Sequence, residues 1–375
     1  MKLLLTGGGT AGHVNPALAI AETVRRNLPG SEIFFCGTEH GMEHRLVSEA
    51  GYPYYPIEVM GFSRSLSPKN LRALYLALTS PRKAKALLRS LAPDLVVGTG
   101  GYVSWPVLSA AASLGIPTAI HESNAVPGLT VRKLAGRSDL VMLNFPEAGA
   151  ALGHAKRIVH VGNPLRQGFS SVTRETARER LGIPLASRLT VSFGGSLGAM
   201  ALNRAVLELW ERHTLHSEQD YHIHGCGNRY YAEMRQEVTH RFGALPERIR
   251  LCEYLNNMPM LMAAADLLIC RSGAMTVTEI ALSHRASILI PSPNVAGDHQ
   301  TKNAEALSAL GAALLIPEKE LNGDSFCAAV VSLLDDKEKR AAMEKAAGGF
   351  GIPDANRRIL SELLSLTEKK KSGAT

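Results

Sequence analysis

A buried-strand pattern, a glycine-rich turn and a helical pattern follow one another twice in this chain. Residues 2–6 (KLLLT) lead into GGGTAGH and the helical pattern VNPALAIAETV, while residues 188–193 (RLTVSF) lead into GGSLGA and MALNRAVLELW. A turn of this kind between a strand and a helix is typical of parallel βαβ units. The repeat therefore predicts an α/β protein made of two doubly wound units, each built on a parallel sheet.

Further apolar segments extend the pattern, and 375 residues are many for a single hydrophobic core. The predicted strands are 32–37, 94–98, 117–121, 139–144 and 157–163, then 220–225, 248–254, 265–270, 287–293 and 312–317. The pattern restarts after Asn163-Pro164, which predicts domains over 1–164 and 165–352. A last helical pattern, about 353–375, is expected to return to the first domain. The loops that follow the strands should surround a shared cleft.

The cysteines and the hydropathy of the chain indicate the cellular compartment in which the protein is expected to work. Five cysteines are scattered along the chain without a CxxC pair, at positions 36, 226, 252, 270 and 327. Such a set is poor material for a disulfide framework or a structural zinc site, so we expect cytosolic, metal-independent chemistry. No segment approaches the roughly 18 apolar residues of a spanning helix, and the N-terminus lacks the cleavage region of a signal peptide. We therefore expect a protein that neither crosses nor leaves through a membrane.

The formal charge of +7 is concentrated in one segment. From Val59 to Pro93 there is no acidic residue, while the basic ones are Arg64, Lys69, Arg72, Arg82, Lys83, Lys85 and Arg89. Apolar residues are interleaved with them at helical spacing: Leu71, Leu74, Tyr75 and Leu78, then Leu87 and Leu88. This pattern suits the surface of an anionic bilayer. The alternative is a solvated helix whose leucines face the core. Nucleic acid is disfavoured because no recognition module accompanies the charge.

The first glycine turn admits more than one interpretation. Gly7, Gly9 and Gly12 match G-x-G-x-x-G, the fingerprint of a dinucleotide-binding dehydrogenase. That fold needs an acidic residue at the end of the second strand, where this chain has Cys36-Gly37. A more general role remains: small residues let backbone N–H groups and a helix dipole face an anion or a polar sugar. The turn could also simply connect two elements.

His13 directly follows this turn, in the first turn of the predicted helix. A helix N-terminus disfavours the imidazolium form, so we expect a neutral ring near pH 7 that can accept a proton. Such a group would serve as a general base. The alternative is a histidine without a chemical role.

The second turn resembles a different active-site motif. Gly194, Ser196 and Gly198 fit G-x-S-x-G, the nucleophile elbow of serine hydrolases. A triad would need an acid and a histidine, which Asp298-His299 supplies only as adjacent residues, an arrangement that rarely forms a relay. The alternative, which we prefer, is that Ser196 and the neighbouring amides bind a diphosphate at the helix N-terminus.

Two further strand ends carry polar residues. In CRSGAMTVTEIAL the helix start near Ser272 and Thr276 can hold a phosphate or hydroxyl, and Glu279 can accept hydrogen bonds from ribose. These residues could instead cap the helix and complement its dipole. The segment PNVAGDHQTKNA is predicted to be a polar loop that leads into a helix. Four of its side chains could reach a polar ligand: Asp298, His299, Gln300 and Asn303. HESN, at 121–124, lacks the second histidine of a zinc motif, and no D-x-D occurs anywhere, so fixed dipoles and arginine should replace a metal.

The ordered motifs GGGTAGHVNPALA, GTGGYVSWP, HESNAVPG, VGNPLR, FGGSLGA, CRSGAMTVTE and DHQTKNA span nearly the whole chain. In this order they resemble the MurG family of bacterial glycosyltransferases. The resemblance implies a GT-B fold of two Rossmann-like domains facing a cleft and transfer of N-acetylglucosamine from UDP-GlcNAc to lipid I. It also implies inverting chemistry, with no metal or other cofactor, in peptidoglycan synthesis.

The resemblance assigns residues to roles. His13 is the implied base for the muramyl C4 hydroxyl. The 165–352 domain would bind UDP-GlcNAc, and the 1–164 domain would bind the acceptor at the membrane. The implied substrate-binding residues are Thr10, Ala11, Gly12, Asn124, Arg166, Ser196, Leu255, Ala274, Met275, Thr276, Val277, Thr278, Glu279, His299 and Gln300. Ala11 stands where many relatives carry glycine, and His299 replaces a second glutamine found in some members.

The implied partners follow from this reaction. They are the UDP-GlcNAc donor, the polyprenyl-diphosphate-linked muramyl-peptide acceptor, an anionic membrane surface and other cell-wall enzymes, without nucleic acid. The implied location is peripheral, on the cytoplasmic face of the bacterial inner membrane. The lipid tail of the acceptor would explain the basic and apolar segment between Arg64 and Arg89.

Overall fold

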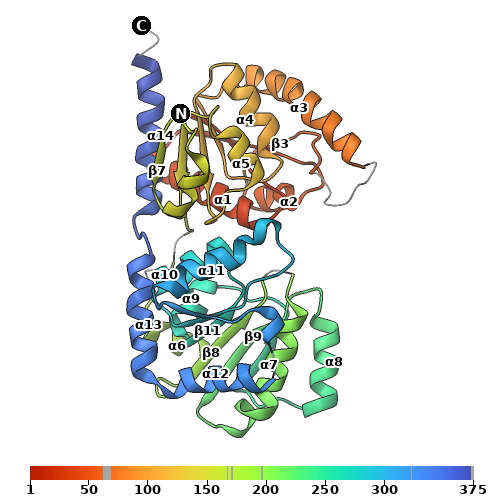
Figure 1. Cartoon of the computed structure of the whole chain (residues 1–375), viewed down its shortest axis with the longest axis vertical. Helices are drawn as coiled ribbons and strands as arrows, with labels where there is room; N and C mark the ends of the chain where they lie inside the picture. Colours follow the sequence, from red (N-terminus) through yellow and green to blue (C-terminus); the bar gives the residue numbers. More distant parts are fainter. Residues whose placement is uncertain (62–68, 167, 170–171, 196, 322, 373–375) are drawn as a thin grey trace. The chain divides into compact units, whose positions relative to one another are not determined.

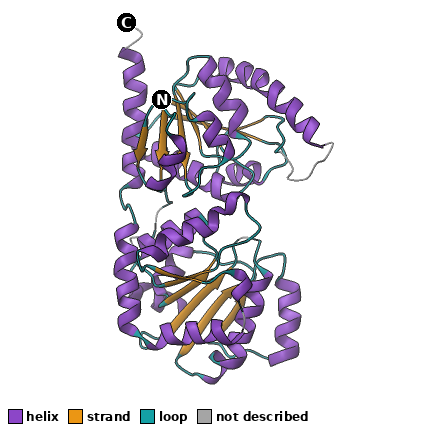
Figure 2. Cartoon of the chain, in the orientation of Figure 1, coloured by secondary structure: helices purple, strands orange, loops and turns teal. Residues whose placement is uncertain are grey.

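The computed structural model describes residues 1–61, 69–166, 168–169, 172–195, 197–321 and 323–372 (Figure 1). The chain divides into two compact units. Unit 1 comprises Met1–Arg166 and Ile352–Thr375, and unit 2 comprises Gln167–Gly351. Both are parallel α/β units, so the predicted fold class is confirmed. Figure 2 shows each sheet covered by helices.

The described part of unit 1 contains a seven-stranded parallel sheet in the order β3-β2-β1-β4-β5-β6-β7. Its strands are β1 (Lys2–Thr6), β2 (Glu32–Gly37), β3 (Tyr54–Pro56), β4 (Leu95–Gly98), β5 (Thr118–Glu122), β6 (Leu140–Leu143) and β7 (Ile158–His160). Its helices are α1 (Ala11–Asn27), α2 (Met42–Glu49), α3 (Lys69–Leu91), α4 (Ser104–Ser113), α5 (Leu129–Leu134), the 3₁₀ segment η1 (Pro146–Leu152) and α14 (Ala355–Ser372). The short edge strand β3 was not among the predicted strands.

Unit 2 repeats this plan with a six-stranded parallel sheet among its described residues, in the order β10-β9-β8-β11-β12-β13. Its strands are β8 (Arg188–Phe193), β9 (Asp220–Gly225), β10 (Ile249–Cys252), β11 (Leu267–Cys270), β12 (Ser287–Leu289) and β13 (Ala313–Leu315). Its α-helices are α6 (Arg174–Leu181), α7 (Met200–Arg212), α8 (Tyr231–Phe242), α9 (Met258–Ala264), α10 (Ala274–Ser283), α11 (His299–Ala309), α12 (Gly323–Asp335) and α13 (Lys337–Phe350). Short 3₁₀ segments are η2 (Thr214–His216), η3 (Ala296–Asp298) and η4 (Glu318–Glu320).

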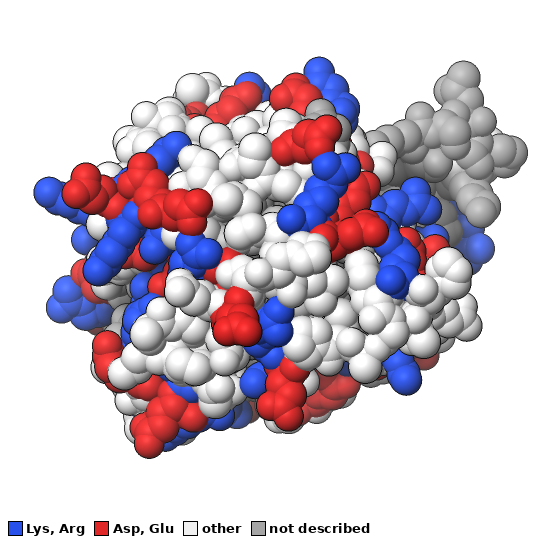
Figure 3. Space-filling view, turned by 90° about the horizontal axis from the view of Figure 1, so that it is seen from below, with Lys and Arg blue, Asp and Glu red and all other residues white. Residues whose placement is uncertain are grey.

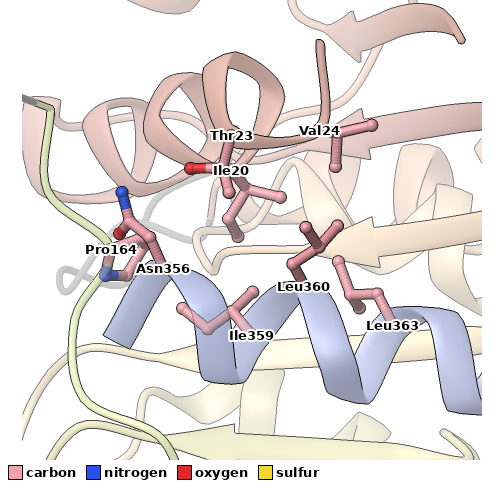
Figure 4. A pocket seen from close by; sticks show the side chains of 8 residues that line it. All are labelled: Ile20, Thr23, Val24, Pro164, Asn356, Ile359, Leu360 and Leu363. Carbon is pink, nitrogen blue, oxygen red and sulfur yellow. The ribbon is translucent and has the colours of Figure 1, made fainter. Parts of the chain in front are cut away.

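The central strands of both sheets are buried along nearly their whole length because helices cover both faces. In unit 1, Leu3 and Leu5 pack with α1 and α14, while Leu4 lies in the core on the opposite face, with α3 and α4. The C-terminal helix α14 belongs to unit 1, where Ile359 and Leu363 are buried against α1. Figure 4 shows this contact, with Ile20 and Val24 of α1 facing the apolar side of α14.

The strand order creates a switch point in each sheet. In unit 1, β1 lies between β2 and β4, so the chain turns to opposite sides of the sheet after β1 and after β4. In unit 2, β8 lies between β9 and β11 in the same way. Loops at such switch points diverge and leave room for a ligand at the carboxyl edge of the sheet. Both glycine-rich turns follow these central strands.

Candidate active site

The first glycine turn joins β1 to α1 at the switch point of unit 1. Gly9 has a φ of 82°, a conformation that favours glycine. Thr10 is the N-cap residue of α1, and among the described residues no side chain caps this helix. Thr10 and Gly12 are exposed and Ala11 is half-buried, so the predicted residues of this turn lie at the surface of unit 1.

His13 is fixed by the turn that precedes it. Its Nδ1 lies 3.0 Å from the Gly8 carbonyl oxygen and 3.1 Å from the Thr10 hydroxyl. A carbonyl oxygen can only accept a hydrogen bond, so Nδ1 carries the proton of the neutral ring and Nε2 carries the lone pair. The backbone carbonyl of His13 accepts a hydrogen bond of 2.6 Å from the Thr99 hydroxyl, which ties the helix start to the end of β4. The geometry therefore gives His13 the tautomer that a base acting through Nε2 requires.

Asn124 and Arg166, the other residues of the predicted site in unit 1, are held by carboxylates. Glu122, at the end of β5, is buried and accepts hydrogen bonds from both the backbone and the side-chain amide of Asn124, at 2.9 and 3.1 Å. Arg166 is exposed, and its Nε lies 3.6 Å from Oε2 of Glu22 on α1. These contacts orient both side chains in unit 1.

The second glycine turn joins β8 to α7 in unit 2. Ser196 lies outside the described residues, but the flanking turn is described, and Gly195 and Gly198 have φ angles of 88° and 79°. The backbone of Gly198 packs against the carbonyl of Cys226, a contact that leaves no space for a side chain. Leu255 is buried and packs against the end of β9, where a Cβ on Gly225 would lie 2.7 Å from its Cγ.

The α10 helix starts directly after β11, at the same switch point. Gly273 is its N-cap residue, and among the described residues no side chain caps it, so Ser272 does not have the capping role considered above. Of the predicted binding residues on α10, Met275 and Thr276 are half-buried, while Ala274, Val277 and Thr278 are buried. The start of α10, which follows the carboxyl end of β11, therefore has backbone amides that no described side chain caps.

Glu279 lies one turn further along α10. Its side chain keeps some exposure, yet burial raises the pKa of its carboxyl to about 8. At neutral pH the group is therefore mostly protonated, and it can both donate and accept a hydrogen bond. A strongly shifted carboxyl at a switch point is a typical feature of a functional site.

Residues of two loops, one before α10 and one after β12, hold Gln300 in the first turn of α11. The buried Ser272 hydroxyl donates to the Gln300 carbonyl at 2.8 Å, and the Gln300 Oε1 accepts from the Ser292 N–H at 2.9 Å. The side-chain amide nitrogen is therefore the part of Gln300 that can donate to a ligand. His299 is half-buried at the start of α11.

One expectation about this loop needs correction, whereas Asp298 is exposed as a ligand-binding side chain would be. Asn303 is fully buried and donates to the Ser272 carbonyl at 3.2 Å, so it supports the loop and does not reach a ligand. Asp298 has a φ of 50° and accepts a hydrogen bond of 2.7 Å from the Thr301 hydroxyl. Its carboxylate therefore orders the start of α11 and pairs with no imidazole in the described residues.

Glu43 is a residue of the site region that the sequence patterns did not indicate. It is on α2, is 1% exposed, and accepts a hydrogen bond of 3.2 Å from the backbone N–H of Gly9. The sequence signal was available, since Glu43 is an acidic residue shortly after the second strand. An acidic residue in the first turn of a helix more often complements the helix dipole, which is why spacing alone did not single it out.

The α3 helix carries the apolar surface that the sequence indicated. Leu71, Leu74, Tyr75 and Leu78 are all exposed, and Leu71 is 73% exposed. The opposite side of α3 is buried. The alternative interpretation, in which the leucines face the core, is therefore wrong for these residues and holds for Leu88. Arg64 lies outside the described residues. No described helix is both long and apolar enough to span a membrane.

Charge elsewhere is mixed. On the face of the molecule drawn in Figure 3, basic and acidic side chains are interspersed. The acid-free segment 59–93 is therefore distinct in composition from that face. Among the described residues, no three His, Cys, Asp or Glu side chains come together as a candidate metal site.

Comparison with known proteins first defines the class. Residues 3–142 match the glycosyltransferase family 28 N-terminal domain, and residues 190–359 match the glycosyltransferase family 28 C-terminal domain. The solved structure of Acinetobacter baumannii MurG is similar over 97% of this chain and 99% of its own, with a TM-score of 0.76 and 27% identity. A UDP-GlcNAc 2-epimerase from Neisseria meningitidis shares the fold, with a TM-score of 0.67, 14% identity and coverage of 97% and 100%. Fold and sequence thus define a GT-B glycosyltransferase.

Full-length relatives then define the family. A protein of Acetivibrio thermocellus is 40% identical over 374 residues, covering all of both chains, and is named "UDP-N-acetylglucosamine--N-acetylmuramyl-(pentapeptide) pyrophosphoryl-undecaprenol N-acetylglucosamine transferase". A protein of Desulforudis audaxviator with the same name is 40% identical over 371 residues, with 98% of each chain covered. The chain belongs to this family of N-acetylglucosamine transferases, the MurG family, and the resemblance inferred from its motifs is confirmed.

Proposed function

We propose that this chain transfers N-acetylglucosamine from UDP-GlcNAc to the muramyl C4 hydroxyl of lipid I, giving lipid II for peptidoglycan synthesis. Membership of the MurG family over the whole chain carries this conclusion. The enzyme is a hexosyltransferase whose substrates are a sugar nucleotide and a lipid-linked muramyl peptide. Nothing in the site or the comparisons favours the serine hydrolase or dehydrogenase alternatives.

The chemistry we propose is a direct displacement at the anomeric carbon. The acceptor oxygen forms a bond to that carbon while the bond to the diphosphate oxygen breaks, and UDP leaves with the electron pair. The configuration changes from α to β. His13 takes the proton of the acceptor hydroxyl at Nε2, which its contact with Gly8 supports because that contact places the ring proton on Nδ1.

Unit 2 supplies the groups proposed to bind the donor. The starts of α7 and α10, with the turn containing Ser196, would stabilise the negative charge that develops on UDP. Glu279 would bind the ribose hydroxyls, and the backbone at Leu255 would contact the uracil. On the sugar, Gln300 would donate from its side-chain amide, with His299 beside it. Ala274, Met275, Thr276, Val277 and Thr278 would surround the phosphates and ribose.

Unit 1 supplies the groups proposed to bind the acceptor and the sugar. Thr10, Ala11, Gly12 and Asn124 would approach the transferred sugar, and Arg166 would lie near the nucleotide. The division of labour between a 1–164 acceptor domain and a 165–352 donor domain is part of the same proposal.

The enzyme acts as a peripheral protein at a membrane, because its acceptor carries a polyprenyl tail. We assign the contact to the exposed apolar face of α3, where Leu71 and Leu78 would insert between lipids and Arg82 and Lys85 would meet anionic head groups. The cytoplasmic face of the inner membrane is the side on which UDP-GlcNAc is available. Other enzymes of cell-wall synthesis would be partners there.

The direct test is transfer of labelled N-acetylglucosamine from UDP-GlcNAc to a short-chain lipid I analogue, with and without EDTA. We expect product in both reactions, because helix dipoles take the place of a metal ion in charge stabilisation. Failure to form product without chelator would reject the activity. Product that disappears with EDTA and returns with Mg²⁺ would reject the metal-independent mechanism.

A further inference from the structure

The peptide group between Gly8 and Gly9 is bonded at both ends by ionisable side chains. Its carbonyl oxygen, on Gly8, lies 3.0 Å from Nδ1 of His13. Its N–H, on Gly9, donates to Oε2 of Glu43 at 3.2 Å. A carboxylate and an imidazole are therefore connected through a single planar amide.

Donors converge on the Glu43 carboxyl. Besides Gly9, the backbone N–H of Thr38 donates to Oε1 at 3.2 Å, and the Thr38 hydroxyl donates to the same oxygen. Glu43 also lies in the first turn of α2, where the helix dipole favours a negative charge. A protonated carboxyl would set its own hydrogen against one of these donors, so the arrangement fits the ionised form.

Gly8 allows the close approach of this carboxylate. A Cβ on Gly8 would lie 2.6 Å from the Glu43 Cδ and 2.8 and 2.9 Å from its oxygens, which is too close for a side chain. The glycine at position 8 therefore lets the loop backbone pack directly on a buried charge. This contact also means that the Gly9 amide is bonded to a protein carboxylate.

We propose that Glu43 is a positioning residue for His13 and acts through the Gly8–Gly9 peptide. The negative charge polarises the amide and strengthens its carbonyl as an acceptor, because hydrogen bonds in a chain reinforce one another. The carbonyl then holds the Nδ1–H tautomer and favours the imidazolium that forms when Nε2 takes a proton. The inference rests on the proposed role of His13 as the base.

Two tyrosines and one cysteine near Glu43 stay uncharged over the range in which an imidazole titrates. Burial, with the nearby charge of Glu43, raises the pKa values of Tyr54 on β3 and Tyr102 after β4. Burial also raises the pKa of Cys36 on β2 to about 12. His44, on α2 itself, stacks on Tyr54 at 4.5 Å between ring centroids and serves below as a control.

The test compares Glu43→Gln with the matched control Glu39→Gln, which removes the same charge at an exposed position of the preceding loop. We expect Glu43→Gln to lower kcat on the order of tenfold, as losses of partners that orient a histidine do. The acid limb of the kcat profile should move to lower pH by about half a unit, because the lost charge stabilised the imidazolium. KM for UDP-GlcNAc should stay within about twofold. Glu39→Gln and His44→Gln should behave as wild type.

A double variant separates this inference from the function on which it rests. If Glu43 acts through His13, adding Glu43→Gln to His13→Ala should cause no further loss of kcat. An equal loss in both backgrounds, or wild-type kcat and pH profile in Glu43→Gln, would overturn the inference and leave the proposed function standing. Wild-type kcat in His13→Ala would instead remove the proposed base, and this inference with it.

A measurement on the unaltered protein keeps the inference testable if Glu43→Gln does not fold. Long-range ¹⁵N NMR correlations of His13 distinguish a protonated Nδ1 from a protonated Nε2. We expect the neutral ring to carry its proton on Nδ1. A neutral ring with the proton on Nε2 would overturn the inference, because the Gly8 carbonyl would then have no donor in His13.

Discussion

The hydroxyl of Ser272 donates to the backbone carbonyl of Gln300 at 2.8 Å, so the start of α10 and the start of α11 are bonded to each other. Asn303 reinforces the contact by donating to the Ser272 carbonyl. These bonds fix the residues proposed to bind the phosphates of the donor relative to those proposed to bind its sugar. A substitution at one of the two helix starts should therefore change the position of the other and weaken donor binding.

Ser272→Ala tests this coupling. The substitution leaves a carbonyl without its donor, which should lower the free energy of unfolding by about 1–3 kcal/mol. We expect KM for UDP-GlcNAc to rise while kcat changes little, because the base is on unit 1. Chemical denaturation and initial-rate kinetics measure both effects. Ser308→Ala, near the C-terminal end of α11, is the control, and an equal effect there would contradict the coupling.

The raised pKa of Glu279 predicts a pH-dependent donor affinity. Ribose hydroxyls that donate to the carboxyl favour its ionised form, so binding should lower the pKa from about 8 and release a proton. Affinity should then rise with pH up to about 8 and level off above it, and Glu279→Gln should remove this rise. Calorimetry in buffers of different ionisation enthalpy measures the proton. Proton uptake, or an affinity independent of pH, would contradict the assignment.

Glu279 also links pH to the stability of unit 2. The folded state holds this proton up to about pH 8, whereas the unfolded chain loses it near 4.5, the ordinary pKa of a glutamate carboxyl. Stability should therefore fall as pH rises between these values, by at most about 1.4 kcal/mol per pH unit. Glu279→Gln should be free of this contribution. Denaturant titrations of both proteins between pH 6 and 8 measure the difference, and parallel curves would argue against the burial of the carboxyl.

A buried chain of hydrogen bonds in unit 2 predicts sensitivity to acid. Trp210 donates to Nδ1 of His222, and Ser192 bridges His222 Nε2 and His224 Nδ1 at 2.7 Å each. The Trp210 N–H can only donate, so Nδ1 of His222 is unprotonated and its Nε2 carries the proton of a neutral ring. In the same way, Ser192 donates to Nδ1 of His224, and Nε2 of His224 donates to the Asn203 side-chain oxygen. Burial lowers the pKa of His224 to about 4 and that of His222 well below 6.5.

The sign of this effect follows from where the protons bind. Between pH 6.5 and 4 the unfolded chain holds protons on these rings that the folded state does not, so stability should fall as pH falls. The loss should approach about 1.4 kcal/mol per pH unit for each ring. We expect His224→Asn to flatten the dependence of the unfolding free energy on pH. The exposed His240→Asn should not, and the same slope in all three proteins would contradict the account.

The exposed face of α3 predicts binding to anionic vesicles. Leu71→Ser and Leu78→Ser should each weaken binding on the order of tenfold, since each removes a side chain that would insert among lipids. Leu185→Ser, at a leucine of unit 2 that is 56% exposed, is the control. Vesicle sedimentation measures the affinities. Equal losses for all three variants, or none, would place the membrane contact elsewhere.

The sequence predicted those features whose cause is local. Both glycine turns were predictable because a strand, small residues and a helix follow one another directly. The exposure of Leu71, Leu74 and Leu78 was not, because helical spacing identifies a face without saying whether core or solvent covers it. In α3 the core side is formed by Ala73, Leu76 and Leu88.

Features that depend on distant residues were missed or misjudged. Edge strand β3 is short and only partly buried, so its pattern is weak. Asn303 has a side-chain amide of the kind that binds sugar hydroxyls. Its amide instead donates to the carbonyl of Ser272, which follows a different strand, β11. Glu43 contacts Gly9 across 34 positions of sequence, a relationship that only the packing of α2 beside the first turn creates.

The central claim is that His13 removes the acceptor proton while unit 2 binds the donor. Turnover of labelled UDP-GlcNAc with a short-chain lipid I analogue by His13→Ala, measured beside UDP-GlcNAc affinity, tests it most directly. We predict that kcat falls on the order of a hundredfold or more while donor affinity is unchanged. Normal turnover by His13→Ala would contradict it.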